Sequence, residues 1–374
     1  MKEFTICCPC HFGLESVLSG EIKRMGGHDI ASEDGVVTFR GDSEMIAKAN
    51  INLRCAERVL IVLGSFKALS FEDLFVGVGE IDWGDYIGRA DAFPVKGWSL
   101  NSKLHSIPDC QSIIKKSIVE KLKRRYNVSW LEETGKTIQI RFSILKDNVK
   151  IMLDTSGVGL HKRGYRQNSN IAPIKETLAA GIIDLAHVKP YTTLYDPFCG
   201  SGTFLIEATT KAFNIAPCLN RRFMAESWGF IENGVWKSAR DEAISNIRRD
   251  SEFVAYGFDI NPECIELTLN NAKKAGIASK IKAAVRDIKD FKIDTEKATV
   301  ICNPPYGERL LDIKEAERLY KTMGQVFNRD ENFSYYIISP HDNFEEIYGE
   351  KADKRRKLYN GMIKCQLYMY FNKK

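Results

Sequence analysis

The sequence lacks any apolar run long enough to cross a membrane. A spanning helix needs about 20 consecutive apolar residues, and no stretch approaches that length. The opening segment, Met1 to Ile6, has too short an apolar run for a signal peptide. We therefore expect a cytoplasmic protein with no membrane partner.

The cysteines lack the spacing of a disulfide framework or of a structural metal site. The ten cysteines are scattered, and some lie in apolar runs such as Thr299–Cys302, so we expect buried, reduced thiols. The segment Cys7–His11 contains a C-x-x-C pair beside a histidine, but no second ligand pair with metal-site spacing follows it. We therefore predict that the protein holds no metal.

Low-complexity segments and repeats are also absent, and the composition, with 44% hydrophobic and 28% charged residues, is that of a globular protein. At 374 residues the chain exceeds what one core usually supports, so we expect two or three domains. The net charge of +5 arises entirely after residue 160, because the first 160 residues hold 21 Lys and Arg against 21 Asp and Glu. Charge alone therefore says little about a nucleic-acid partner.

From about residue 190 the sequence alternates between strand-like and helix-like segments, the pattern of a parallel sheet covered on both faces. The expected strands are Thr192–Tyr195, Phe253–Phe258, Lys280–Val285, Ala298–Cys302 and Tyr335–Ser339, and the expected helices are Phe204–Phe213, Pro262–Ala275 and Lys314–Phe327. Near the end, Arg356–Tyr359 and Met362–Phe371 flank Asn360-Gly361, a strong hairpin signal. We expect an α/β fold whose parallel sheet carries an antiparallel hairpin at one edge.

Before residue 160 the pattern mixes short strands and helices. Thr137–Leu145 and Val149–Asp154 predict a hairpin, and Ser112–Tyr126 predicts a helix with one apolar stripe. The other faces of that helix carry the cations Lys115, Lys116, Lys123 and Arg124. These cations fit either a phosphate-contacting face or a solvated surface, and the pattern leaves both readings open.

The loop after the first strand is rich in glycine and is followed by a helix. Gly200 and Gly202 permit a close approach of backbone to a ligand, and the amides that begin a helix suit a small anionic group. A tight strand-to-helix corner is the alternative explanation for the glycines. The predicted cofactor-binding residues of this loop are Asp196, Phe198, Gly200, Ser201, Gly202 and Thr203.

The next two strands also end on acids. Asp259, followed by Ile260, can accept hydrogen bonds from a ribose diol, and Asp287, followed by Ile288, can reach an adenine amino group. Ligands of open sheets bind beyond the carboxyl ends of the strands, so these tips predict an adenosine site. A dinucleotide fingerprint is excluded, because G-x-G-x-x-G with an acid about 20 residues later does not occur here.

The loop after the fourth strand, Asn303-Pro304-Pro305-Tyr306, is the most specific motif in the chain. The Asn303 side-chain oxygen and a proline-fixed carbonyl can each accept one hydrogen of an exocyclic base amine, which aims the nitrogen lone pair at an electrophile. The Tyr306 ring can stack on the base. With S-adenosylmethionine as cofactor, alignment is most of what catalysis requires. We therefore predict Asn303, Pro304 and Tyr306 as catalytic residues, with Asn303 also bordering the cofactor.

Three segments together resemble the THUMP-domain class I RNA methyltransferases, most closely the bacterial branch that makes N2-methylguanosine in large-subunit ribosomal RNA. These segments are Asp196–Ala208, Asn303–Arg309 and Gly159–Arg166. The resemblance spans nearly the whole chain and implies a ferredoxin-like part over residues 1–60, a THUMP RNA-binding domain over 61–158 and a Rossmann-like methyltransferase domain over 159–374. It implies that Thr177 lies in the segment entering the cofactor site. It also implies that a guanine is the target of Asn303.

The connector before the catalytic domain carries Lys162, Arg163 and Arg166, which we predict to contact RNA; a salt-bridged joint between domains is the alternative. The motif after the fourth strand also occurs in enzymes that methylate DNA adenine or a release-factor glutamine, so it does not name the base. The expected partner is 23S ribosomal RNA or a precursor. Transfer RNA guanine is the second candidate, and a non-catalytic RNA-binding assembly factor is a third from a different class.

Overall fold

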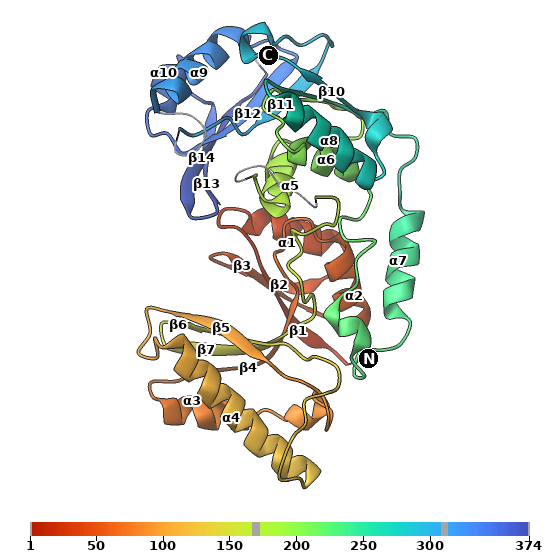
Figure 1. The fold of residues 1–374 in the computed structure, drawn as a ribbon, viewed down its shortest axis with the longest axis vertical. Coiled ribbons are helices and arrows are strands. Elements are labelled where there is room, and N and C mark those ends of the chain that lie inside the picture. Colours follow the sequence, from red (N-terminus) through yellow and green to blue (C-terminus); the bar gives the residue numbers. More distant parts are fainter. Residues whose placement is uncertain (1, 167–172, 308–312, 373–374) are drawn as a thin grey trace.

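The computed structural model describes residues 2–166, 173–307 and 313–372, and these residues form two seven-stranded mixed sheets (Figure 1). The first sheet belongs to the N-terminal half and the second to the C-terminal half. Within the described residues, no helix has the length and apolarity that a membrane crossing requires. The expected α/β class is confirmed. Glu308 and Arg309, at the end of one motif quoted above, lie outside the described residues.

The N-terminal sheet has the strand order β2-β3-β1-β4-β7-β6-β5. Its strands are β1 (Phe4–Pro9), β2 (His28–Glu33), β3 (Val36–Gly41), β4 (Leu60–Lys67), β5 (Val95–Leu100), β6 (Ile140–Leu145) and β7 (Asn148–Asp154). Its helices are α1 (Glu15–Arg24), α2 (Ser43–Asn52), α3 (Phe71–Gly79) and α4 (Ile107–Tyr126). The chain order β1-α1-β2-β3-α2-β4 with the spatial order β2-β3-β1-β4 is a ferredoxin-like arrangement. Strand β4 pairs with both β1 and β7, so one strand joins this unit to the rest of the N-terminal half.

The predicted N-terminal hairpin and helix are both present. Strands β6 and β7 are joined by Lys146 and Asp147, which both have positive φ, as a tight two-residue turn requires. Helix α4 begins at Ile107, five residues before the predicted start, because Pro108 occupies its first turn. The predicted apolar stripe is on its inner face, where Ile114, Ile118 and Leu122 are buried.

The C-terminal sheet has the strand order β10-β9-β8-β11-β12-β14-β13. Its strands are β8 (Thr193–Asp196), β9 (Val254–Asp259), β10 (Ile281–Val285), β11 (Ala298–Cys302), β12 (Phe333–Ser339), β13 (Lys354–Asn360) and β14 (Ile363–Tyr370). The helices of this half are α5 (Glu176–Leu185), α6 (Thr203–Ala212), α7 (Val235–Ser245), α8 (Pro262–Lys274), α9 (Ile313–Val326) and α10 (Phe344–Tyr348). The strands β8 to β12 are parallel, and β14 and β13 form the predicted antiparallel hairpin at one edge.

The turn of that hairpin lies one residue later than the sequence suggests. Asn360 pairs with Ile363, so the two loop residues are Gly361 and Met362. Gly361 has a φ of 66°, the conformation that a type II′ turn places on glycine at its first central position. Asn360 is therefore part of β13, and its side chain is available for a contact across the sheet.

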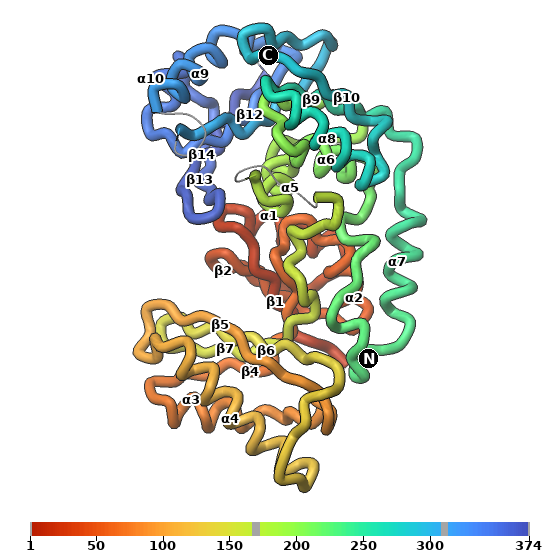
Figure 2. Tube along the Cα trace, viewed as in Figure 1, coloured from red at the N-terminus to blue at the C-terminus, as the bar shows by residue number. Residues whose placement is uncertain are grey.

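The two halves are held together by a segment that follows α6 and returns to the N-terminal half. Trp228 donates its indole N–H to the Thr137 carbonyl at 3.0 Å, and α7 packs on α2 with a 2.8 Å ion pair between Lys48 and Glu242. In Figures 1 and 2, α7 runs along one side of the molecule, while the β13–β14 hairpin reaches the N-terminal half on the other side. The C-terminal half therefore contacts the N-terminal half on both of these sides.

Candidate active site

Four polar residues lie in a row along the carboxyl edge of the parallel strands. Because β10, β9, β8 and β11 are neighbours in that order, their tips bring Asp287, Asp259, Asp196 and Asn303 to consecutive positions. The three acids and the asparagine were predicted separately from the sequence, and the strand order places them beside one another. Such an edge is where open α/β sheets bind their ligands.

The glycine-rich loop between β8 and α6 lies against the tip of β9. The Gly200 amide donates to the Asp259 carboxylate at 3.0 Å, and the Cys199 amide donates to the Phe258 carbonyl at 2.9 Å. Gly202 has a φ of 80°, and a Cβ there would lie 2.9 Å from the Thr268 side chain of α8. The loop therefore requires glycine at 202 for both its backbone conformation and its packing.

Asp259 is held in place by backbone amides on both of its oxygens. One oxygen accepts from Gly200 and the other from the Asn261 amide at 2.9 Å. Each carboxylate oxygen has a further lone pair, so a ribose diol can still be bound. Ile260, which follows, is 69% exposed and offers an apolar surface beside that position.

Asp196 is buried at the end of β8, where the Phe198 amide donates to it at 3.0 Å. Burial raises the pKa of this carboxyl well above its usual range, and the nearby Asp259 charge raises it further. A cationic group bound beside Asp196 would offset both effects. The site is therefore electrostatically suited to the ammonium of a methionine moiety.

The tip of β10 is arranged by its own backbone. Asp287 accepts from the Lys289 amide at 3.0 Å and forms an ion pair with the Lys289 side chain at 3.4 Å. Ile288 is buried in the core of the domain, so its side chain supports the tip. The Arg286 guanidinium lies 4.0 Å from the centre of the Phe258 ring, which fixes the turn before Asp287.

The loop after β11 is anchored from two sides. The Tyr320 hydroxyl of α9 donates to the Pro305 carbonyl at 3.0 Å, and the Asn360 amide of β13 donates to the Tyr306 hydroxyl at 3.3 Å. The Tyr306 hydroxyl in turn donates to the Asn303 side-chain oxygen. The Asn303 oxygen that is predicted to bind the amine therefore accepts a bond from Tyr306 in this conformation, and the Tyr306 ring packs against the core.

Thr177, predicted to border the cofactor, forms a hydrogen bond within a cluster of side chains away from the strand tips. Its hydroxyl donates to Glu57, which also pairs with His11 at 3.1 Å and with His161 at 3.3 Å. Burial favours a higher Glu57 pKa, but the hydrogen bonds from His11, His161 and Thr177 outweigh it and lower the pKa well below its usual range. The Thr177 side chain thus takes part in a contact between domains, and its predicted place beside the cofactor stays a prediction.

Burial contradicts one predicted RNA contact, Arg163, and a second predicted contact, the half-buried Lys115, is held by other partners. Arg163 is buried and pairs with the buried Glu207 at 3.5 Å, so it is part of the joint between domains. The Lys115 ammonium is bound to the Phe93 carbonyl at 3.1 Å and to Glu133 at 2.6 Å. Neither cation is free to meet a phosphate.

The other predicted RNA contacts differ in exposure. Lys116, Arg124 and Lys162 are exposed, Lys123 is half-buried, and Arg166 is largely buried in an ion pair with Glu176. Helix α4 lies at the end of the molecule away from the C-terminal sheet (Figure 1). An RNA that contacts both α4 and Asn303 would have to span most of the molecule.

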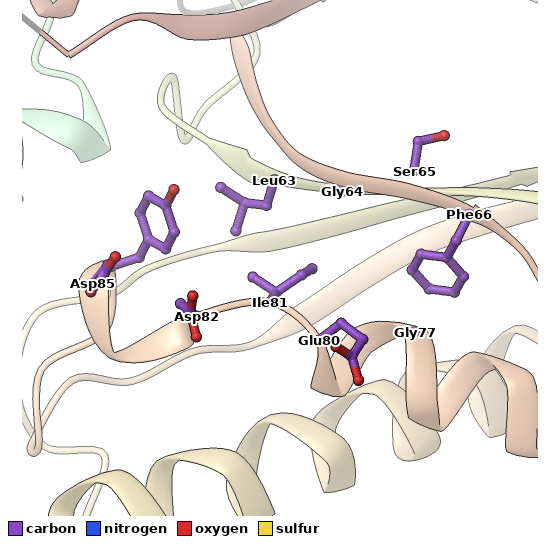
Figure 3. A pocket seen from close by; sticks show the side chains of 10 residues that line it. Leu63, Gly64, Ser65, Phe66, Gly77, Glu80, Ile81, Asp82 and Asp85 are labelled. Atoms are coloured by element: carbon purple, nitrogen blue, oxygen red, sulfur yellow. The ribbon is translucent and has the colours of Figure 1, made fainter.

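Two other features do not contribute to this site. Cys7, Cys8 and Cys10 are buried in and beside β1, where burial raises their thiol pKa values, and the described residues contain no group of three metal-ligating side chains suited to an ion. A hollow of about 450 Å³ between β4 and the end of α3 is lined by Glu80, Asp82 and Asp85 (Figure 3). Its carboxylates make it unsuitable for phosphates, and it lies in the N-terminal half.

Known protein domains match the chain in three consecutive parts. Residues 5–60 match the RlmL ferredoxin-like domain and residues 68–154 match the THUMP domain. Residues 163–369, which contain the whole row of site residues, match the methyltransferase domain described as RMKL-like. The chain belongs to this RMKL-like methyltransferase family.

Full-length relatives of this RMKL-like methyltransferase have the same architecture. Putative RNA methyltransferase YpsC of Bacillus subtilis (strain 168) is 42% identical over 375 residues, which cover 100% of this chain and 97% of YpsC. The structure of SMU.472, described as a putative methyltransferase complexed with SAH, is 41% identical, with a TM-score of 0.94 over 100% of this chain and 99% of that one. A protein described as a predicted N6-adenine-specific DNA methylase from Listeria monocytogenes is 43% identical, with a TM-score of 0.93 over 100% and 97%.

The site of the RMKL-like methyltransferase fits S-adenosylmethionine. The glycine loop has no side chain at Gly200, where a Cβ would meet nothing within 4 Å, so backbone can approach a ligand there. The buried Asp196 lacks a cationic partner among the contacts that the structure describes, and Asp259 keeps lone pairs for a diol. Asp196, Asp259 and Asp287 would hold the methionine, ribose and adenine parts in that order.

Sequence reasoning missed the residues that position the site. Tyr320, Asn360 and Glu57 act through contacts between elements far apart in the chain, so no local pattern reports them. Tyr320 on the buried face of α9 reads only as a core aromatic. The placement of Asn360 in β13 follows from the turn register, which the Asn-Gly pair does not determine alone.

Proposed function

We propose that the protein transfers a methyl group from S-adenosylmethionine, its cofactor, to the exocyclic N2 of a guanine in 23S ribosomal RNA. The observation that carries this proposal is the row of strand tips in which Asn303 follows Asp196, at the methyl end of the cofactor positions. A substrate amine bound to Asn303 would lie beside that end. When bound, the cofactor would supply a methyl group on a sulfonium sulfur: as the bond from nitrogen to this carbon forms, the carbon–sulfur bond breaks, S-adenosylhomocysteine leaves, and one amine proton passes to water.

The residues of the chain then act by orientation. The Asn303 side-chain oxygen and the Pro304 carbonyl accept the two hydrogens of the target amine, which turns its lone pair toward the methyl group. Pro304 and Pro305 limit the backbone, and the Tyr320 hydrogen bond to the Pro305 carbonyl keeps the loop in place. Alignment of nucleophile and electrophile accounts for a large part of the barrier in such reactions.

Tyr306 must move for its ring to stack on the base, because the ring is packed against the core. This movement also breaks the bond from its hydroxyl to Asn303, so both lone pairs of the Asn303 oxygen become available to the substrate. The released ring can then stack on the guanine, a contact that contributes about 1–3 kcal/mol on single-stranded platforms. The tyrosine thus closes the empty site and binds the base in the occupied one.

An RNA substrate is supported by the N-terminal half. The THUMP match and the name of the B. subtilis relative both point to RNA, whereas the Listeria relative is described as a DNA methylase. The exposed cations Lys116, Arg124 and Lys162 provide phosphate contacts. A guanine within a duplex must be flipped out at a cost of a few kcal/mol, so single-stranded or loosely structured RNA is the favoured substrate.

The test is methyl transfer from labelled cofactor to separate pools of ribosomal RNA, transfer RNA and genomic DNA from a strain that lacks the enzyme. We expect N2-methylguanosine in the large-subunit pool, and transcripts in which inosine replaces guanosine should accept nothing, because inosine has no N2 amine. Methyl transfer to the tRNA pool alone would make transfer RNA, rather than 23S ribosomal RNA, the substrate. Label in 6-methyladenine of DNA would contradict the proposal, and no transfer to any pool would favour a binding protein without activity.

A further inference from the structure

The β13–β14 hairpin is strongly basic. Residues 354–371 contain five cations and no carboxylate. The five are Lys354, Arg355, Arg356, Lys357 and Lys364. Arg356 binds the Gly13 carbonyl at 2.6 Å and the Ser16 hydroxyl at 3.0 Å, and Arg355 pairs with Glu345 at 3.4 Å. The three lysines are exposed, so they provide most of the positive surface of this edge.

Aromatic rings lie among these cations. Tyr359 lies directly opposite Lys364 in the strand pairing, and Lys357 is two residues before it, so all three side chains share one face of the hairpin. The Lys357 ammonium is 5.4 Å from the centre of the Tyr359 ring. Phe12, from the turn before α1, is 51% exposed and lies edge-on to Tyr359 with ring centres 6.0 Å apart.

This cluster and the loop Asn303–Tyr306, which we call the catalytic loop, lie on opposite faces of the hairpin. Asn360 follows Tyr359 and points to the other face, where it donates to the Tyr306 hydroxyl beside Asn303.

We propose that Phe12, Lys357, Tyr359 and Lys364 form a platform that binds the single-stranded RNA flanking the target guanine. This inference rests on the proposed function, because it assigns a second contact to the same substrate. Exposed rings interleaved with cations suit unpaired bases, which stack on aromatic side chains while lysines meet the phosphates. A duplex offers no free base faces to these rings. The platform draws one residue from the ferredoxin-like part, so it is complete only when the two halves are docked.

Lysines on an edge strand also prevent edge-to-edge association of sheets. That role explains neither the exposed Phe12 ring nor the pairing of Phe12 with Tyr359 across two domains. A role in preventing sheet association predicts that replacing the lysines changes aggregation and leaves RNA affinity unchanged. The two roles therefore have different readouts.

The experiment measures binding of the full chain to a fluorescein-labelled, unstructured 12-nucleotide RNA with one central guanine, over a range of salt concentrations. The variants are Tyr359→Leu, Phe12→Leu and the double variant Lys357→Gln with Lys364→Gln. Lys282→Gln is the matched control, because Lys282 is also exposed and lies 5.3 Å from a tyrosine ring, on the strand at the opposite edge of the same sheet. Circular dichroism and cofactor binding show that each variant is folded.

Each ring variant should raise the Kd for this RNA about tenfold, and the double lysine variant should reduce the slope of log K against log salt by about 0.7 per lysine. In methyl-transfer assays the same variants should raise KM for RNA and leave kcat unchanged. Binding equal to that of the wild-type chain, or an equal loss in Lys282→Gln, would overturn the platform. If the wild-type chain binds this RNA but methylates no RNA, the proposed function fails, and the binding data still decide the platform.

Discussion

Asn303 and Asp259 lie at the ends of strands β11 and β9, separated by β8, and we propose separate tasks for their side chains. Asp259 is fixed by the amides of Gly200 and Asn261, which suits the proposed binding of a diol. Asn303 is bonded to Tyr306, beside the position that we propose for the substrate amine. Cofactor binding and amine orientation are therefore separable at single residues.

Asn303→Ala should lower kcat by about two to three orders of magnitude, by analogy with the loss of one oriented hydrogen-bonding group in an active site. Its cofactor affinity should change less than about threefold, because Asn303 acts on the amine. Asp259→Ala should weaken cofactor binding roughly 10- to 100-fold through the loss of charge-assisted hydrogen bonds. Calorimetric titration with S-adenosylhomocysteine and single-turnover transfer measure the two effects, and an equal loss of cofactor affinity in both variants would contradict this division.

Asp196→Asn should stabilise the cofactor-free protein near neutral pH. The folded-state pKa of Asp196 is raised, so the folded protein binds this proton more tightly than the unfolded chain and loses stability as the pH rises above the unfolded value of about 3.9. Asparagine keeps an acceptor for the Phe198 amide without the charge. Thermal unfolding should show a higher Tm than the wild type near neutral pH and none of this gain below about pH 4, together with weaker cofactor binding. A lower Tm at neutral pH would show that the carboxylate is satisfied in the empty site.

For single residues, the sequence predicts the position of a side chain in its own motif but not its partner from a distant part of the chain. The positions of Asp196, Asp259 and Asn303 could be predicted because each ends or directly follows a strand in a recognisable motif. The positions of Arg163 and Lys115 could not be predicted, because a cation in a basic stretch gives no sign that a distant Glu207 or Glu133 will pair with it.

Among the elements, the β13–β14 hairpin connects the catalytic loop to the N-terminal half. On one side Asn360 binds Tyr306, and on the other Arg356 binds the turn that contains Gly13. The strands could be predicted to within two residues from alternation and the Asn-Gly signal. The contact of these strands with residues 12–16 could not be predicted, because it joins segments more than 300 residues apart. Helices α5 and α7 were also not predicted, because their faces pack against other elements rather than showing a clear pattern.

Gly13→Ala should separate the hairpin from the N-terminal half. A Cβ at Gly13 would lie 2.5 Å from the Lys357 carbonyl, and the φ of 88° adds strain. Gly26→Ala is the control, because Gly26 has a φ of 91° and a Cβ there meets nothing within 4 Å. Both variants should lose about 1 kcal/mol from backbone strain, and only Gly13→Ala should also reduce kcat and increase amide hydrogen exchange in β13. Equal effects of the two variants on kcat and exchange would argue against a role for this contact.

On the scale of the whole molecule, the catalytic sheet and the distant α4 are held in one arrangement by buried ion pairs. Arg163 and Glu207, both buried, lie at the joint, with Tyr165 donating to Glu207 at 3.0 Å. Glu57 and its two histidines form a second joint beside the first. These contacts join the ferredoxin-like part to the C-terminal half.

Arg163→Met should destabilise the protein by roughly 3–5 kcal/mol, because it leaves Glu207 buried without its counter-charge, and it should not alter the salt dependence of RNA binding. Lys162→Gln should have the opposite pattern of effects on stability and on the salt dependence of RNA binding. Its stability should be unchanged, while the slope of log K against log salt falls by about 0.7–0.9 for one lost phosphate contact. Urea denaturation and RNA titrations at several salt concentrations provide both quantities. A reduced slope in a folded Arg163→Met protein would restore Arg163 as an RNA contact.

The central claim is tested most directly by nucleoside mass spectrometry of large-subunit ribosomal RNA from cells whose only copy of this protein carries Asn303→Ala, compared with cells carrying the wild type. The account predicts the loss of one N2-methylguanosine per large subunit in the variant cells, and its return when their isolated RNA is incubated with the wild-type protein and S-adenosylmethionine. Identical N2-methylguanosine contents in the two RNA samples, or a missing methyl on another base, would contradict it.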